Sequence, residues 1–474
     1  MSKKTADPNK PRVPLGKFFA WKSSDISSAG VAWIVNTYML IFCTNALGMD
    51  SVLAGTVLLA ANIFDMITDL VIGYLMDKAP VTKWGKYRPF ELGIIGSTLF
   101  TILLFVCPFG GQAMKVIWVF VIYAILFGIF NTARTGAMFP YMIRAFDNDR
   151  NRIGKILSLG GIVTTMGAAV ITMTFPKLVA AYGSGTAESL SVGAWRRIIL
   201  IYMIPLTVIG IFRFLFIKEN PAIDAGQQDI HLHLSDVFKM IKANPYIWAY
   251  GFMIFAFQAI QNLGANAYYF DYIVGSQDKM GTLSLFSYFL MPLLLLMPLL
   301  LRKLGAGRII LIAGIVALGG YVCNFFAGDS MMLLIIGTAL TSLVTLPISY
   351  LGGVLQMNIF NYTEYKGLPR QEATTNAIAS GVFTQLGQGF GPFLVGIILK
   401  ASGFVSSEAG TAVTQPASAV MSIRLLYSFV PLLLMVVIIF ACTFLHKLEK
   451  KMPAIEQELE ERRQAVVSGH QNNG

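Results

Sequence analysis

The feature that most constrains this chain is a series of long apolar blocks, each close to the roughly 20 residues that a helix needs to span a bilayer. About twelve such blocks follow one another, and many contain Gly, Ser and Thr, as closely packed membrane helices do. Charged residues make up only 13% of the chain, against about 25% in soluble domains. The pattern predicts an all-α membrane protein. The approximate bounds of the blocks are 27–47, 52–76, 91–109, 115–143, 154–176, 196–217, 244–275, 281–301, 307–327, 330–358, 374–401 and 418–445.

Lys and Arg residues are unevenly distributed among the connections that join the blocks. The even-numbered connections are rich in Lys and Arg, whereas the odd-numbered connections hold few. Because positive charge favours the cytoplasmic side of a membrane, we expect both termini in the cytoplasm and the bacterial inner membrane as the location. The net charge of +11 is then a topology signal. Nucleic-acid binding would need a basic face on a soluble domain, which the sequence does not indicate.

The longest internal connection divides the chain into halves. Its second part has apolar residues at helical spacing, which predicts a short amphipathic helix on the membrane surface. The basic loops at 83–88 and 302–308 occupy matching places in the two halves, as parallel repeats would. We expect an N-terminal bundle at 1–217, the connection at 218–243, a C-terminal bundle at 244–446 and a cytoplasmic tail at 447–474.

The block at 52–76 carries two carboxylates at membrane depth. Asp65 and Asp69 are four residues apart, so a helix places both on one face, one turn apart. Because charged groups are too costly to face lipid, this face must line a cavity or meet a cation or a basic partner. A bound cation, or a proton on one carboxylate, would relieve the repulsion between them. The spacing indicates an ion-coupling site, with a structural pair held by Arg or Lys as the alternative.

Polar residues in several other blocks indicate an internal pathway. Amides in the 244–275 and 374–401 blocks are typical of helices that line a cavity, although hydrogen bonds between helices would also explain them. Arg134 could reach the cytoplasm or line the cavity beside a carboxylate or an anionic substrate. Asp25 fits an N-cap of the first helix slightly better than a substrate contact. The candidate substrate-binding residues are Asp25, Asn36, Thr132, Arg134, Gln258, Gln261, Asn262, Thr384, Gln385 and Gln388.

Charged residues in the cytoplasmic connections are candidates for gating. For Arg150 and Arg152, whose loop links the fourth and fifth blocks, a solvated charged loop is the alternative explanation. The candidate gating residues are Lys86, Arg88, Arg150, Arg152 and Glu364.

No pattern in the sequence indicates an enzyme. There is no G-x-x-x-x-G-K-[ST] phosphate loop, which argues against an ATP-driven pump, and no nucleophile–base set stands out. The four cysteines are isolated in apolar segments, where they are best explained as small buried hydrophobes. We therefore expect no catalytic activity, no metal and no cofactor other than a coupling ion.

The chain resembles the glycoside–pentoside–hexuronide cation symporters, the melibiose-carrier branch of the major facilitator superfamily. The most specific part of the resemblance is Asp65-x-x-x-Asp69 followed by the loop Trp84-Gly85-Lys86-Tyr87-Arg88-Pro89. The resemblance implies twelve transmembrane helices in two six-helix bundles with alternating access. It implies that Asp65 and Asp69, with Thr68 nearby, bind Na⁺ or take a proton, and that a sugar binds between the bundles.

Several positions depart from the pattern of the melibiose carriers. Their two sugar-binding carboxylates correspond to Ala29 and Thr132, and their lysine on the eleventh helix corresponds to Gln385. A galactoside is therefore not the expected cargo, whereas Arg134 would suit a hexuronide or another acidic glycoside. We expect a monomeric Na⁺- or H⁺-coupled symporter of a sugar or glycoside. The alternatives are a transporter of another substrate, such as a lysolipid, and a membrane sensor without transport.

Overall fold

The computed structural model describes residues 13–107, 110–147, 150–220, 242, 244–288, 290–367, 377–406 and 413–471. Within them every regular element is a helix, which confirms the all-α prediction. The chain divides into two compact units, Met1–Gln228 with Ser406–Ala412 and Asp229–Val405 with Val413–Gly474. The boundary between the units falls inside the predicted connection, whose amphipathic stretch lies outside the described residues.

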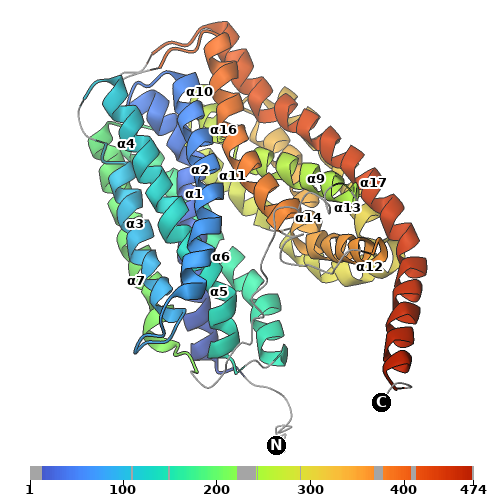
Figure 1. Cartoon of the computed structure of the whole chain (residues 1–474). Coiled ribbons are helices and arrows are strands. Elements are labelled where there is room, and N and C mark those ends of the chain that lie inside the picture. Colours follow the sequence, from blue (N-terminus) through green and yellow to red (C-terminus); the bar gives the residue numbers. More distant parts are fainter. Residues whose placement is uncertain are drawn as a thin grey trace, which may run out of the picture. The chain divides into compact units, whose positions relative to one another are not determined.

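The N-terminal unit is a set of long helices (Figure 1). Some of them are continued by short π- or 3₁₀-helical segments. The elements are α1 (Leu15–Ile41), η1 (Phe42–Ala46), α2 (Ser51–Lys78), η2 (Arg88–Leu92), α3 (Gly93–Leu104), α4 (Gln112–Ile125), η3 (Leu126–Asn131), α5 (Thr132–Ala145), α6 (Arg150–Tyr182) and α7 (Val192–Phe216).

The C-terminal unit is built in the same way. Its elements are α9 (Tyr246–Gln261), α10 (Ala265–Tyr272), α11 (Gln277–Tyr288), η4 (Met291–Leu296), α12 (Met297–Leu304), α13 (Ala306–Ala327), α14 (Met331–Tyr365), η5 (Ala377–Val382), α16 (Phe383–Ala401) and α17 (Ala417–Gln471).

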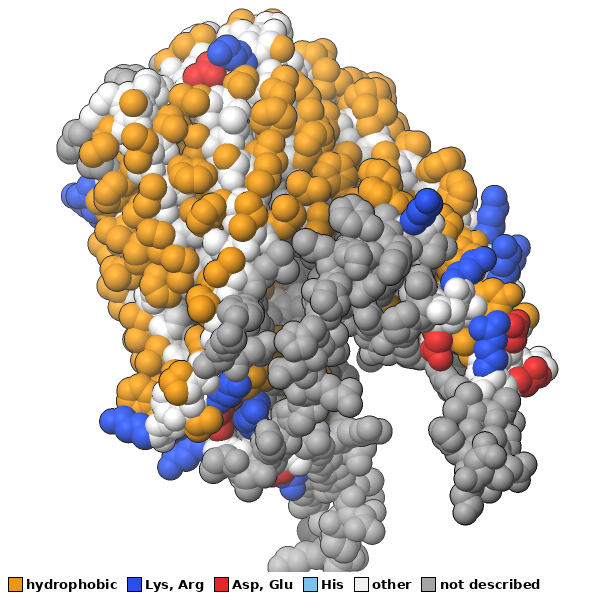
Figure 2. Space-filling model, viewed as in Figure 1, with side chains coloured by type: hydrophobic (Ala, Val, Ile, Leu, Met, Phe, Trp, Pro, Cys, Tyr) orange, Lys and Arg blue, Asp and Glu red, His pale blue; other side chains and the backbone are white. Residues whose placement is uncertain are grey.

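The described helices have the length and surface of membrane spans. Nine of them are long and apolar enough to cross a bilayer, while the count of twelve stays a prediction. Hydrophobic side chains dominate the described surface in Figure 2, and many large ones are exposed, such as Phe216, Phe326 and Phe440. Because such surface would be costly in water, lipid is the solvent that this fold requires.

The first helix begins earlier than predicted. The sequence block started at residue 27, but α1 starts at Leu15, because Ala20 and Trp21 pack into a buried cluster of the N-terminal unit. Asp25 therefore lies well inside the helix. The interpretation of Asp25 as an N-cap is wrong.

The last helix continues without a break past residue 446, where the sequence suggested that a separate tail begins. In α17, Leu448, Met452 and Ile455 are buried in the core of the C-terminal unit. Charged residues are frequent in this stretch, so its apolar residues do not form a continuous block. They nevertheless recur at helical spacing and extend the packed face of the helix.

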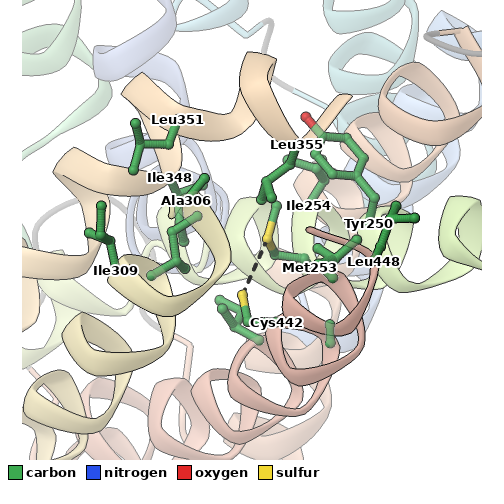
Figure 3. Packing of buried hydrophobic residues seen from close by; sticks show 14 of the residues in the cluster. Tyr250, Met253, Ile254, Ala306, Ile309, Ile348, Leu351, Leu355, Cys442 and Leu448 are labelled. Atoms are coloured by element: carbon green, nitrogen blue, oxygen red, sulfur yellow. Dashed lines mark hydrogen bonds between the residues drawn. The ribbon is translucent and has the colours of Figure 1, made fainter. Parts of the chain in front are cut away.

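Each unit has its own hydrophobic core. In the N-terminal unit, Trp195 packs against Tyr38, Phe42 and Phe105, with ring centroids 5.6, 5.9 and 5.7 Å apart. In the C-terminal unit, side chains of α9, α13, α14 and α17 interlock around Met253, whose Sδ lies 3.6 Å from Cys442 Sγ (Figure 3). Cys442 thus packs as a small hydrophobe, as the sequence indicated.

A glutamate after the last helix of the N-terminal unit organises the basic loop at 83–88. The carboxylate of Glu219 accepts hydrogen bonds from the backbone N–H groups of Lys86, Tyr87 and Arg88, at 2.6, 2.7 and 2.6 Å. Gly85 has a φ of 113°, and a Cβ there would lie 2.1 Å from the same carboxylate. Only glycine fits this position, for its conformation and for its size.

The C-terminal unit repeats this arrangement. Glu449 of α17 accepts hydrogen bonds from the backbone N–H groups of Ala306 and Gly307, at 2.6 and 3.1 Å. Gly305, which precedes them, has a φ of 79° and also faces the glutamate. The two carboxylate-bound glycine loops occupy matching places in the halves, and they support the internal repeat that the basic loops suggested.

Candidate functional site

The two membrane carboxylates lie on α2. Asp50 caps the start of this helix by accepting hydrogen bonds from the backbone N–H groups of Val52 and Leu53, at 3.1 and 3.2 Å. Asp65 is 4% exposed and Asp69 is half-buried. The helix thus carries the pair on one face into the interior of the N-terminal unit, as the spacing predicted.

The hydroxyl of Thr132 lies between the two carboxylates. Its Oγ1 is 3.1 Å from Asp65 Oδ1 and 2.7 Å from Asp69 Oδ1, and it is also 3.0 Å from the carbonyl oxygen of Phe127. The hydroxyl has one proton, so it can donate to only one of these three oxygens at a time. The sequence predicted Thr132 as a substrate-binding residue, but the structure places it against the carboxylate pair.

A π-helical segment positions Thr132. Segment η3 ends at Asn131, immediately before Thr132, and the hydroxyl of Thr132 approaches the carbonyl oxygen five residues earlier. Wide turns of this kind are common at functional sites because they redirect side chains and loosen backbone carbonyls. Thr68 donates from Oγ1 to Asp65 O at 2.9 Å and packs against Gly128 of η3. The predicted cation-binding residues therefore come together with η3 and Thr132.

The chemistry of this site suits a small hard cation or a proton. Two carboxylates, a hydroxyl and a backbone carbonyl are oxygen donors, which hard cations prefer. Two ionised carboxylates beside one hydroxyl repel each other, and a positive charge between them removes this repulsion. The described residues contain no group of three or more His, Cys, Asp or Glu side chains that could hold a metal.

Arg134 lies two residues after Thr132 on α5 and is 4% exposed. Its Nη1 donates to Ser24 Oγ at 3.1 Å, and its Nη2 donates to Asn131 Oδ1 at 3.4 Å. The interpretation in which Arg134 reaches the cytoplasm is wrong. Its described hydrogen bonds also do not go to Asp65 or Asp69, and its Nε is buried without a hydrogen-bond partner.

A buried ion network lies beside Arg134. The guanidinium of Arg213 contacts Asp25 and lies 3.0 Å from Glu91 Oε1, while Lys22 Nζ lies 2.9 Å from Asp25 Oδ2. Ser24 Oγ donates to Glu91 Oε2 at 2.9 Å and so connects the network to Arg134. Asp25, a predicted substrate-binding residue, is thus engaged with two cations.

Glu91 and Arg213 are members of a buried site that the sequence did not indicate. Glu91 stands at the start of the 91–109 block, and Arg213 lies near the end of the 196–217 block. Both side chains have 0% exposure. The signal that identified Asp65 and Asp69, a charge inside an apolar block, applies equally to these two residues.

The remaining candidate substrate residues lie on α1, α9 and α16. Asn36 is half-buried on α1, and Asn262 Nδ2 donates to Gln258 O at 2.8 Å. Gln261 lines a polar cavity within the C-terminal unit. Helix α16 packs closely on α9, because a Cβ at Gly387 would lie 2.5 Å from Phe255 O. The half-buried polar residues on α16 are Thr384, Gln385 and Gln388.

Two of the candidate gating residues make defined contacts inside the N-terminal unit. Arg88 donates from Nε and Nη2 to Phe214 O at 2.9 and 2.6 Å, and its guanidinium stacks on the Phe214 ring. Arg152 forms a partly exposed salt bridge with Asp147, at 3.1 Å.

The other three candidate gating residues are placed less fully. Lys86 is half-buried in the glycine loop, and Glu364 is half-buried near the end of α14. The side chain of Arg150 lies outside what the structure describes. A gating role stays a prediction for all five residues.

Comparisons with known proteins agree on the class of this chain. The family model described as MFS/sugar transport protein matches residues 23–450. The chain is 25% identical over 466 residues to an isoprimeverose transporter of Lactiplantibacillus pentosus, covering 96% of this chain and 93% of the relative. It is 23% identical over 448 residues to a glucuronide carrier protein homolog of Escherichia coli strain K12, covering 90% and 91%.

Solved structures show the same fold at lower identity. A D-xylose–proton symporter matches with a TM-score of 0.63 and 14% identity, covering 91% of this chain and 97% of that one. A nucleoside transporter matches with a TM-score of 0.60 and 16% identity, covering 91% and 99%. The chain is therefore an integral membrane transporter, not an enzyme, and it belongs to the MFS/sugar transport protein family, the glycoside–pentoside–hexuronide type within the major facilitator superfamily.

Proposed function

We propose that the chain is a secondary active symporter that moves a sugar or glycoside together with Na⁺ or H⁺ by alternating access. The observation that carries the coupling is the Thr132 hydroxyl, which lies within 3.1 Å of one membrane carboxylate and 2.7 Å of the other. The sugar class is supported by the family and by relatives that are named for isoprimeverose and for glucuronide.

The carboxylate pair couples the two solutes through binding energy. A cation between Asp65 and Asp69 cancels their repulsion beside the hydroxyl of Thr132 at the start of α5. If the cation raises the affinity for the sugar, the sugar must raise the affinity for the cation by the same factor. A downhill cation gradient then drives sugar accumulation.

The ion network favours an acidic cargo as a second option within the same function. It holds three cations, Lys22, Arg134 and Arg213, against two carboxylates, Asp25 and Glu91. Among the described residues, the buried Nε of Arg134 has no hydrogen-bond partner. A guanidinium of this kind suits the carboxylate of a hexuronide.

The topology proposal places both termini in the cytoplasm of a bacterium, with the protein acting as a monomer in the inner membrane. The uneven distribution of Lys and Arg among the connections supports the orientation. The monomer is supported by the carboxylate site, which lies within one unit. A fluorescent protein fused to the C-terminus should fluoresce, whereas alkaline phosphatase fused there should be inactive. An active phosphatase would contradict this orientation.

Uptake by membrane vesicles tests the proposed function. The panel should contain neutral glycosides, pentoses, hexoses and hexuronides, each with an imposed Na⁺ gradient, pH gradient or neither. We expect at least one of these sugars to accumulate only when a cation gradient is present. Equal uptake with and without any gradient, or accumulation of no sugar, would refute the proposal.

A further inference from the structure

The N-terminal unit has an apolar groove between α6 and α7, with a volume of about 510 Å³. This volume falls within the roughly 300–1,000 Å³ of pockets that hold drug-sized ligands. Both helices pack on α1. Ile171 and Leu206 form the buried floor, because a Cβ at Gly30 of α1 would collide with Ile171 and lie 3.2 Å from a methyl carbon of Leu206. The groove shares no residue with the carboxylate site or the ion network.

The walls of the groove suit a hydrocarbon chain. Its two hydroxyl groups use their protons inside the protein, because Tyr202 donates to Thr174 Oγ1 at 2.7 Å and Thr174 donates to Val170 O at 2.6 Å. A hydroxyl has a single proton to donate, so neither group can donate to a polar solute at the same time. The apolar lining residues are Ile171, Leu178, Ile201, Pro205, Leu206 and Ile209.

A cation stands at one end of the groove. Lys177 is exposed, and among the described lining residues it is the only charged one. Arg197 is also exposed, four residues before the lining residue Ile201 and thus one turn nearer to the start of α7. Lys177 lies five residues before the end of α6, and Arg197 lies five residues after the start of α7. At a rise of about 1.5 Å per residue, the two cations lie at the same level of this antiparallel helix pair.

These cations stand out from the charge distribution of the rest of the chain. The odd-numbered connections hold few basic residues, yet Lys177, Arg196 and Arg197 border one of them, with Glu188 as the single acid between them. Basic residues are infrequent on the non-cytoplasmic side of membrane proteins. An anionic partner at the membrane surface accounts for three of them at one place. Lipid headgroups lie at the ends of the spans and carry such charge.

We propose that this groove binds an anionic phospholipid, with an acyl chain against the apolar wall and the phosphate beside Lys177 and Arg197. The long apolar lining and the cation at its end match the two parts of one such lipid. A zwitterionic lipid has the same chains but no net charge, so it gains less from the two cations. In the proposed topology the lipid belongs to the outer leaflet. The site depends neither on the cargo nor on the coupling cation.

Lipid binding to the delipidated full-length protein in detergent tests this site. Native mass spectrometry measures the affinity of the first bound lipid, with dioleoyl-phosphatidylglycerol as the anionic probe and dioleoyl-phosphatidylethanolamine as the zwitterionic probe. We expect wild type to prefer the anionic lipid about fivefold or more. Lys177→Gln should weaken anionic lipid binding about fivefold, the effect of one basic residue beside an anionic lipid, and leave zwitterionic lipid binding unchanged. Lys279→Gln is the matched control, since Lys279 belongs to α11 of the C-terminal unit and does not line the groove.

Two tryptophan variants test the groove itself. Ile201 and Ile204 are 47% and 58% exposed on α7, but only Ile201 lines the groove. Ile201→Trp should fill the groove and weaken binding of both lipids about tenfold or more, since each CH₂ that loses its apolar contact costs roughly a factor of four. Ile204→Trp should bind both lipids as wild type does. The unfolding temperature of each lipid-free variant shows whether it is folded.

Each outcome supports or overturns the lipid site. Equal affinity of wild type for the two lipids, anionic lipid binding unchanged by Lys177→Gln, or equal binding by the two tryptophan variants would overturn it. If Ile201→Trp converted a dimer to a monomer in light scattering without changing lipid binding, the occupant would be a second copy of the chain. Should Ile201→Trp fail to fold, the comparison of the two lipids on wild type and on Lys177→Gln still decides. Cation-driven sugar uptake is a separate measurement, so either proposal can fail alone.

Discussion

At the scale of single residues, the Thr132 hydroxyl is the contact that joins the two membrane carboxylates. Replacing Thr132 with Val keeps the shape of the side chain and removes its oxygen. Hydrogen bonds to charged groups are worth about 1.5–3 kcal/mol, so we expect the apparent affinity for the coupling cation to fall about tenfold or more. The cation concentration at half-maximal uptake measures this effect.

Thr132→Ser is the control for that substitution. It keeps the hydroxyl and loses one methyl group, so its cation dependence should stay close to that of wild type. If Val and Ser variants required the same cation concentration, the hydroxyl would have no part in coupling.

The salt bridge between Glu91 and Arg213 is the best-buried ion pair in the part of the chain that the structure describes. Removing one partner of a buried pair leaves the other charge uncompensated, which costs about 3–5 kcal/mol. We therefore expect Glu91→Gln to lower the free energy of unfolding by that order, measured by denaturation in detergent.

The exposed pair of Arg152 and Asp147 gives a matched comparison. Because water screens such pairs, Asp147→Asn should change the stability by about 1 kcal/mol or less. If Glu91→Gln and Asp147→Asn lowered the free energy of unfolding equally, burial would not determine how much the ion network contributes to stability.

At the scale of elements, the two glutamate-bound glycine loops hold the turn between neighbouring helices in each unit. Glu219 accepts three backbone hydrogen bonds and Glu449 accepts two. We expect Glu219→Ala and Glu449→Ala each to lower the unfolding temperature, with a loss of about 1–3 kcal/mol from the N–H groups left without partners. The larger effect should belong to Glu219.

Glu460→Ala serves as the control, because Glu460 is exposed on α17. A shift as large as that of Glu219→Ala would mean that the loss of any exposed carboxylate destabilises the protein. The backbone contacts would then not be the cause.

Helices were predictable from the sequence where an apolar block is continuous. Helix α2 was found because its block, 52–76, has no interruption, and the cap at Asp50 came only from the structure. The first turns of α1 and the continuity of α17 past residue 446 were missed, because charged residues lie between the apolar residues of the buried face there. The π-helical segment before Thr132 has no sequence signal of its own, since its turn depends on packing against α2.

At the scale of the whole molecule, the all-α membrane fold followed from apolar blocks, and the family followed from the Asp65-x-x-x-Asp69 motif and the basic loop. The contacts that complete the site could not be predicted in this way. Thr132 and Asp65 are 67 positions apart, and Arg213 and Asp25 are 188 apart. Local spacing reports which face of one helix a residue occupies, but it does not report which distant residue will meet that face.

The central claim is that Asp65 and Asp69 bind the cation whose gradient drives the sugar. The most direct test is sugar accumulation by vesicles that contain the Asp65→Asn, Asp69→Asn double variant, with exchange of sugar down its own gradient measured in the same vesicles. We predict that uphill accumulation is lost, whereas the neutral amides let exchange continue at a measurable rate. Accumulation at the wild-type level by the double variant would contradict the account.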